Sequence, residues 1–142
     1  MTTNTGSATY EGLGKDGKGH VSTGSGALAA QPYGFNTRFE DAPGTNPEEL
    51  IAAAHASCFT MALSFALAKA GHTDGSLTTH ATVTLEKDGD GFTVTKSALA
   101  TKGKVPGMDQ AQFEELAKGA KEGCPISKLL NCEITLDTTF EG

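Results

Sequence analysis

Arginine is almost missing from this chain of 142 residues, because Arg38 is the only one. The other basic residues are scattered lysines, and the formal net charge is −6. No basic stripe, aromatic-basic alternation or Cys/His finger spacing is present, and these are the usual patterns of nucleic-acid-binding proteins. We therefore expect no nucleic-acid partner, and Arg38 stands out as a lone strong cation.

Export and membrane signals are also missing. Residues 1–5 contain no basic segment followed by an apolar one, and no apolar run is expected to approach membrane-spanning length. Cysteine is scarce and odd in number, since the chain has three, which argues against a structural disulfide framework. These absences predict a cytoplasmic protein that has reduced thiols and no membrane partner.

The most regular segment of the chain is a long apolar helix. The length of the chain predicts a single domain over residues 1–142. Asn46 is a favourable N-cap and Pro47 suits the first helical position, so the helix is predicted to begin here and to continue to about Ala70. Its interior carries almost no charge, and a helix that is apolar on every side is expected to be enclosed by the rest of the fold.

Shorter elements surround this helix in the sequence. Alternating apolar and polar residues predict several strands, and cap signals predict two further helices. The strands are expected at residues 7–11, 20–28, 76–86, 92–101 and 132–141, the helices at 109–122 and 124–130, and an irregular segment at 31–39. The order β-β-α-β-β-α-β predicts an α+β fold with an antiparallel sheet packed around the long central helix.

Cys58 lies about three turns into the predicted central helix. The helix dipole has little effect there, and burial would raise the pKa of the thiol, so an inert core cysteine is one interpretation. A reactive Cys58 would need a nearby cation, and the guanidinium of Arg38 is suited to this because it stays charged when partly buried. Met61 and Phe65 are expected in the core, or lining an apolar pocket beside the sulfur.

Arg38 in turn would need a carboxylate to hold it. Helix geometry places Glu48 about 80° around the axis from Cys58 and Glu49 about 180° away, which favours Glu48. The alternative for both glutamates is stabilisation of the helix N-terminus. His55, one turn before Cys58, is expected to be a hydrogen-bonded structural residue rather than a catalytic base.

Cys124 is placed differently, at the start of the short helix predicted at 124–130. Free N–H groups at a helix start favour a thiolate, and Lys128 adds positive charge. Local chemistry alone therefore makes Cys124 a candidate for the attacking thiol, with a simple helix cap as the alternative. Cys132 lies on the apolar face of the last predicted strand and is expected to be an inert core residue.

Two long motifs among these residues resemble those of a known family. They are GTNPEELIAAAHASCF at residues 44–59 and GCPIS at residues 123–127. Both resemble the OsmC/Ohr family, and the segment QPYGFNTRF at 31–39 resembles the OsmC branch rather than the Ohr branch. The resemblance extends over nearly the whole chain.

The resemblance implies a thiol peroxidase of the antioxidant stress response, which reduces hydroperoxides, preferably organic ones, with a dithiol as electron donor. It implies an intertwined homodimer with its active sites at the subunit interface. It makes Cys58 the peroxidatic cysteine, Cys124 the resolving cysteine in an intrasubunit disulfide, Arg38 the activating cation and Glu48 the partner of Arg38. It thus replaces the local argument that Cys124 attacks first. Cys132 departs from the family pattern, and no cofactor is implied.

Three other functions use the same residues. A peroxide sensor without turnover and an apolar ligand-binding protein are alternatives built on the two thiols. A structural zinc site formed by His55, Cys58 and Cys124 is a third, although it lacks a fourth ligand.

Overall fold

The computed structural model describes residues 1–142, which divide into two compact units. The first is Met1–Leu50 and the second is Ile51–Gly142. The single domain expected over residues 1–142 from the chain length stays a prediction.

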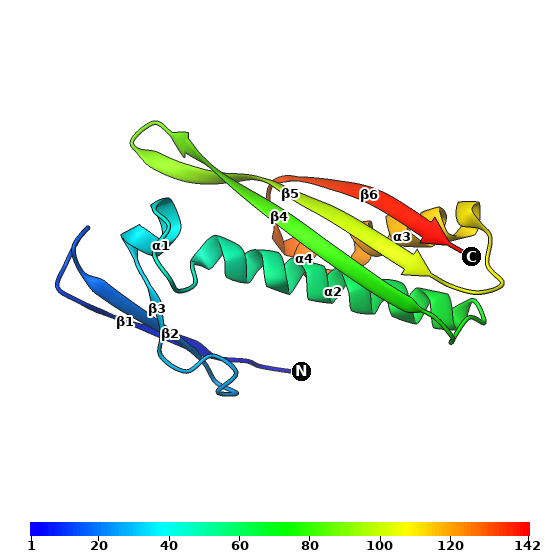
Figure 1. The fold of residues 1–142 in the computed structure, drawn as a ribbon, viewed down its shortest axis with the longest axis horizontal. Coiled ribbons are helices and arrows are strands. Elements are labelled where there is room, and N and C mark those ends of the chain that lie inside the picture. The colour runs from blue at the N-terminus through cyan, green and yellow to red at the C-terminus, as the bar shows by residue number, and fades with distance from the viewer. The chain divides into compact units, whose positions relative to one another are not determined.

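The first unit is built on a small antiparallel sheet, which contains β1 (Gly6–Glu11), β2 (Lys18–Thr23) and β3 (Gln31–Tyr33) in that order (Figure 1). The one-turn helix α1 (Phe35–Phe39) follows β3. The sequence predicted an irregular segment where β3 and α1 lie, so that prediction was wrong. Thr37 explains the helical turn, because its hydroxyl accepts a hydrogen bond from the Gly34 N–H (2.8 Å) and donates one to the Gly34 carbonyl (3.0 Å).

A glycine in β2 allows two aromatic rings to pack on this sheet. The rings of Tyr10 and Tyr33 meet edge to face, with centroids 6.1 Å apart. A Cβ atom at Gly19 would lie 2.6 Å from the Tyr33 ring and 2.9 Å from the Tyr10 ring, which is too close for any side chain. Gly19 therefore lets the two tyrosines cover the strand.

The second unit contains a sheet and three helices. The helix α2 (Pro47–Lys69) begins in the first unit and forms the long helix of the second. The further elements, in chain order, are β4 (Ser76–Asp88), β5 (Gly91–Lys104), α3 (Gln110–Gly123), α4 (Pro125–Leu129) and β6 (Glu133–Glu141). The predicted α+β class is confirmed, and the boundaries of α2 agree with its predicted cap and stop signals.

The second sheet has the order β4-β5-β6 and is mixed (Figure 1). β4 and β5 form an antiparallel hairpin, as expected. β6, however, runs parallel to β5, so an entirely antiparallel sheet was wrong in this detail. The connection through α3 and α4 is a crossover that returns the chain to the same end of the sheet, which a parallel pair requires.

The core of the second unit lies between one face of β5 and the helices. Phe59 and Leu63 of α2, Leu99 of β5 and Phe113 of α3 are at most 1% exposed. Burial of each such side chain contributes about 1.5–3 kcal/mol to stability. Phe113 also packs on Phe140 of β6, with ring centroids 4.9 Å apart. This core anchors the middle of α2, where Cys58 lies.

Only one face of α2 is buried within the chain. The buried row contains His55, Phe59, Leu63 and Leu67, at intervals of four residues. Met61 and Phe65 lie on another side of the helix and are 61% and 68% exposed. The prediction that they belong to the core was therefore wrong, because an apolar pattern on all sides does not indicate which row of residues the sheet covers.

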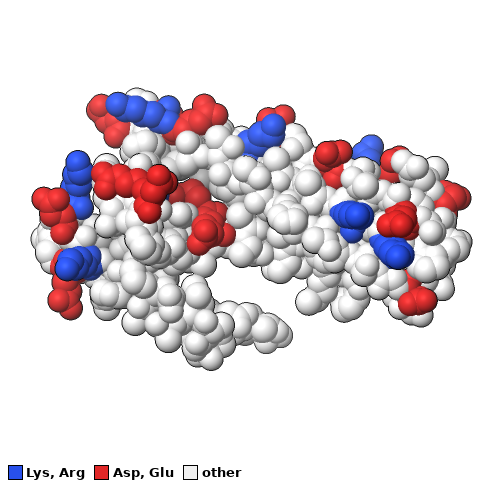
Figure 2. Space-filling model, viewed as in Figure 1, with Lys and Arg blue, Asp and Glu red and all other residues white.

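The apolar length of α2 was also underestimated from the sequence. By length and composition alone, α2 is long and apolar enough to cross a membrane, with a mean hydropathy of 1.7. Core helices of soluble proteins often have the same length and composition. On the face drawn in Figure 2, Lys and Arg side chains are interspersed with Asp and Glu and form no basic stripe.

Candidate active site

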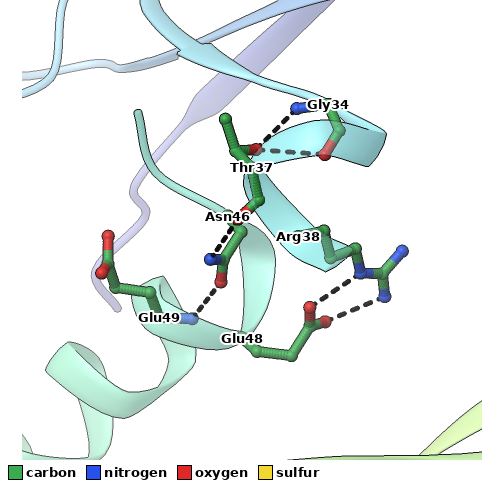
Figure 3. A network of polar contacts seen from close by, with 6 residues as sticks. All are labelled: Gly34, Thr37, Arg38, Asn46, Glu48 and Glu49. Carbon is green, nitrogen blue, oxygen red and sulfur yellow. Dashed lines mark hydrogen bonds and ion pairs between the residues drawn. The ribbon is translucent and has the colours of Figure 1, made fainter. Parts of the chain in front are cut away.

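Arg38 and Glu48 form a two-pronged ion pair (Figure 3). Arg38 Nε donates to Glu48 Oε1 at 2.7 Å, and Arg38 Nη2 donates to Glu48 Oε2 at 2.9 Å. These hydrogen bonds raise the pKa of Arg38 further above its ordinary value, so the guanidinium remains cationic. The side chains are 35% and 13% exposed. The pairing that the sequence favoured is present, and the guanidinium keeps N–H groups for a further acceptor.

The start of α2 explains why Glu48, and not Glu49, is available to the arginine. The Asn46 side chain caps the helix by accepting from the Glu49 N–H at 2.7 Å, and its amide donates to the Thr37 carbonyl of α1 at 3.1 Å (Figure 3). The carboxylate of Glu49 instead accepts from the Thr45 hydroxyl at 2.8 Å. Asn46 thus ties the helix start to α1 and holds the arginine and its partner face to face.

An aromatic pocket of about 430 Å³ lies beside the arginine in the first unit. The Arg38 guanidinium lies over the Phe39 ring, 5.4 Å from its centroid. Lys15 lies over the Phe35 ring on the same pocket, with Nζ 5.0 Å from the centroid. The pocket therefore combines an apolar lining with a fixed positive charge.

Cys58 and Cys124 lie together in the second unit. All three cysteines of the chain are free thiols, and Cys58 packs against the core cluster that contains Cys124, close enough for the two thiols to interact. Burial raises the pKa of Cys58, the N–H of Ile126 acts in the opposite direction, and the contact with the Cys124 thiol raises it further. Without a cation, Cys58 is therefore held mainly as a thiol at neutral pH.

Cys124 occupies the junction of α3 and α4 and is 1% exposed. Its N–H donates to the Ala120 carbonyl at 3.0 Å, and its sulfur accepts from the Ser127 N–H at 3.3 Å. It is thus the N-cap of α4, the alternative role that the sequence left open, and it contacts Cys58 at the same time. The first turn of α4 directs backbone N–H groups at both sulfurs.

His55 is fully buried between two serines. Its Nδ1 lies 2.6 Å from Ser97 Oγ of β5, and its Nε2 lies 2.7 Å from Ser127 Oγ of α4. Burial lowers the pKa of His55, so the ring is neutral at neutral pH. The predicted hydrogen bonding of this histidine is confirmed. Its partners Ser97 and Ser127 were not predicted from the sequence, although Ser127 lies in the GCPIS motif.

Cys132 is not part of this cluster. It lies between α4 and β6, one residue before the strand, and is half-buried. Its predicted place on the apolar face of the strand was wrong, because β6 begins at Glu133. The zinc interpretation also loses support, since both nitrogens of His55 face serine hydroxyls and no group of three or more potential metal ligands is found.

Comparison with known proteins identifies the family. The sequence model of the family described as OsmC-like protein matches residues 39–139, which include the two thiols and Glu48. The chain belongs to the OsmC-like protein family. The match covers well over half of the chain, and it agrees with the resemblance inferred from the motifs.

Several relatives of this OsmC-like chain are known. "Peroxiredoxin OsmC" of Escherichia coli (strain K12) is 57% identical over 132 residues, which cover 93% of this chain and 92% of that protein. The crystal structure of the organic hydroperoxide resistance protein OhrB of Bacillus subtilis has a TM-score of 0.65 and 27% identity, covering 96% of this chain and 98% of that one. The OsmC-like protein from Mycoplasma pneumoniae shares the fold, with a TM-score of 0.76 at 15% identity, over 99% of both chains.

Proposed function

We propose that this protein is a cysteine-based thiol peroxidase that reduces hydroperoxides, preferably organic ones, to alcohols. The observation that carries the proposal is the contact between the two free thiols Cys58 and Cys124. The names of the Escherichia coli and Bacillus subtilis relatives, a peroxiredoxin and an organic hydroperoxide resistance protein, support the same activity. The aromatic pocket beside Arg38 supports a preference for apolar peroxides.

The first step is attack by Cys58. Its thiolate attacks the distal peroxide oxygen, the O–O bond breaks, and the departing alkoxide takes up a proton to leave as an alcohol, while Cys58 becomes a sulfenic acid. Since burial raises the pKa of Cys58, this step needs a cation that stabilises the thiolate. We assign that role to Arg38, acting on Cys58 of its own or of a second copy, with Glu48 as the carboxylate that orients it. A guanidinium also stabilises the charge that develops on the leaving oxygen.

The second step is resolution by Cys124. Its thiol condenses with the sulfenic acid to form an intrasubunit disulfide and water, which protects Cys58 from further oxidation. A dithiol reductant then attacks this disulfide and returns both cysteines to thiols. No step in this sequence needs a cofactor.

Stoichiometry with cumene hydroperoxide tests the scheme. The parent is Cys132→Ser, which removes the third thiol from the analysis. We expect this parent to turn over steadily with dithiothreitol, because its disulfide is reduced in each cycle. Without dithiothreitol, Cys124→Ser should consume one equivalent quickly and then only the further hydroperoxide that over-oxidation of Cys58 requires, and Cys58→Ser should consume none. Intact-mass analysis follows the products.

Each alternative gives a different outcome. A peroxide sensor would consume one equivalent in the parent without steady turnover. An apolar ligand-binding protein would bind the hydroperoxide without consuming it. Normal turnover by Cys58→Ser would overturn the proposed roles of the two cysteines.

We further propose that a second copy of the chain covers the exposed face of α2, so that the protein is a homodimer. Met61 and Phe65 support this because large apolar side chains rarely stay in water together on one helix face. A cytoplasmic location without a membrane or nucleic-acid partner is part of the same proposal. Light scattering of the purified protein should give the mass of two chains, and a monomer at all concentrations would overturn it.

A further inference from the structure

A continuous chain of hydrogen bonds connects the proposed resolving cysteine to the buried histidine. Cys124 Sγ lies 3.2 Å from Ser127 Oγ, which lies 2.7 Å from His55 Nε2. On the far side of the ring, His55 Nδ1 lies 2.6 Å from Ser97 Oγ. The four residues come from α4 and its cap, α2 and β5, and none is more than 8% exposed. The peroxidase scheme above leaves His55 and both serines without a role.

The count of protons gives this chain a direction. A neutral imidazole carries one N–H and one acceptor nitrogen, and each serine hydroxyl has one proton to donate. If Nδ1–H donates to Ser97, then Nε2 accepts from Ser127, and the Ser127 oxygen is free to accept from the Cys124 thiol. Burial lowers the pKa of His55, so the ring is neutral at neutral pH with a free acceptor at Nε2, and a proton taken up there is held only transiently.

We propose that His55 and Ser127, with Ser97 orienting the ring, position the Cys124 thiol and accept its proton while the disulfide with Cys58 forms. The proposal rests on the proposed peroxidase function and concerns only its resolving step. His55 acts on Cys124 through Ser127 and touches neither the peroxide nor Cys58 in this scheme. It is therefore a positioning residue.

The Cys124 S–H proton passes to Ser127 Oγ while the Ser127 proton passes to His55 Nε2. The electron pair of the Cys124 sulfur forms the S–S bond, and the S–O bond of the Cys58 sulfenic acid breaks. The hydroxide departs on the side of Cys58 away from Cys124 and takes up a proton from solvent to leave as water, and His55 gives its proton back to solvent. Cys124 is oxidised, the sulfenic sulfur of Cys58 is reduced, and the histidine and serine return to their initial state.

A purely structural role of this cluster predicts something different. Loss of a structural hydrogen bond would lower the stability of the protein and affect both chemical steps or neither. Loss of a proton path would slow disulfide formation and leave the preceding oxidation of Cys58 unchanged. The rates of the two steps therefore separate the two roles.

The test is a single turnover with one equivalent of cumene hydroperoxide, in the full-length protein carrying Cys132→Ser. Quenched samples analysed by mass give the rate of sulfenic acid formation and the rate of disulfide formation separately. Ser127→Ala should slow disulfide formation about 10²-fold, at the low end of general acid–base effects, without changing sulfenic acid formation. Ser127→Thr, which keeps the hydroxyl, should restore most of the rate.

Ser57→Ala is the matched control. Ser57 directly precedes Cys58, but its hydroxyl donates to the Ala54 carbonyl at 3.0 Å and it is exposed. Both rates should stay at the parent value in this variant. Disulfide formation at the parent rate in a folded Ser127→Ala, or equal slowing of both steps, would overturn the inference.

If Ser127→Ala does not fold, Ser97→Ala provides a second test, because it removes the far end of the hydrogen-bond chain. This variant should slow only disulfide formation, and unchanged rates would equally overturn the inference. If the parent itself forms no sulfenic acid at Cys58, the proposed function fails rather than the proton path. A parent that forms both products at measurable rates establishes the reaction on which the inference is tested.

Discussion

The two polar clusters of this protein differ in their exposure to water. The Arg38–Glu48 pair lies in the first unit and is partly exposed, whereas His55, Ser97 and Cys124 lie in the second unit and are at most 1% exposed. A solvent-exposed ion pair contributes about 0–1 kcal/mol to stability, while a buried polar group that loses its partner costs about 1–3 kcal/mol. Changes in the exposed pair should therefore affect activity without unfolding the protein, and changes in the buried cluster should affect both.

Arg38→Ala should give the largest loss of activity of any change in the exposed pair. Without the guanidinium, the raised pKa of Cys58 leaves little thiolate at neutral pH, and the leaving oxygen loses its positive partner. We expect kcat/KM for cumene hydroperoxide to fall about 10²–10³-fold, with an unchanged melting temperature. Steady-state rates with dithiothreitol and thermal unfolding by circular dichroism measure the two quantities.

Matched variants show whether this effect belongs to Arg38 itself. Lys15→Ala removes the other cation from the same pocket and should leave kcat/KM nearly unchanged. Glu48→Gln should lower kcat/KM about tenfold, because one charged hydrogen bond to the guanidinium is weakened. Glu49→Gln is the matched control for this change, because it alters only the contact with Thr45 and not the guanidinium. An equal loss of activity in Lys15→Ala and Arg38→Ala would contradict a specific role for the arginine.

The sequence was most informative where local rules decide the structure. The cap at Asn46 and Pro47 and the stop near Gly71 defined α2 closely, because helix ends depend on neighbouring residues. The preference for Glu48 over Glu49 followed from helix geometry alone. The motifs around Cys58 and Cys124 identified the family, and the structure brings these two thiols together from positions 66 residues apart in the chain.

The sequence was less informative where distant segments meet. The parallel pairing of β6 with β5 depends on the path of the crossover, which no local pattern records. The contact of His55 with Ser97 joins residues 42 positions apart, and a serine in a strand gives no signal of such a contact. Met61 and Phe65 were misplaced because every side of α2 is apolar, so hydrophobic periodicity could not select the buried row.

The smallest expected effect is the pH dependence of stability, and it tests the buried cluster. Burial lowers the pKa of His55 in the folded state, while in the unfolded chain it titrates near its ordinary value of about 6.5. The unfolded chain therefore binds the proton first on acidification. Stability should fall as the pH drops below about 6.5 and through the lowered pKa, by at most about 1.4 kcal/mol per pH unit.

Urea unfolding between pH 7 and pH 5 measures this slope. Removal of the titrating ring in His55→Gln should make the slope shallower, even if the variant is less stable at every pH. His80→Gln, at an exposed position of β4, and Arg38→Ala should both keep the slope of the wild type. The same slope in His55→Gln and in the wild type would contradict a neutral, buried His55. The proposed proton path from Cys124 would then lose its support, because it needs an unprotonated ring nitrogen as the acceptor.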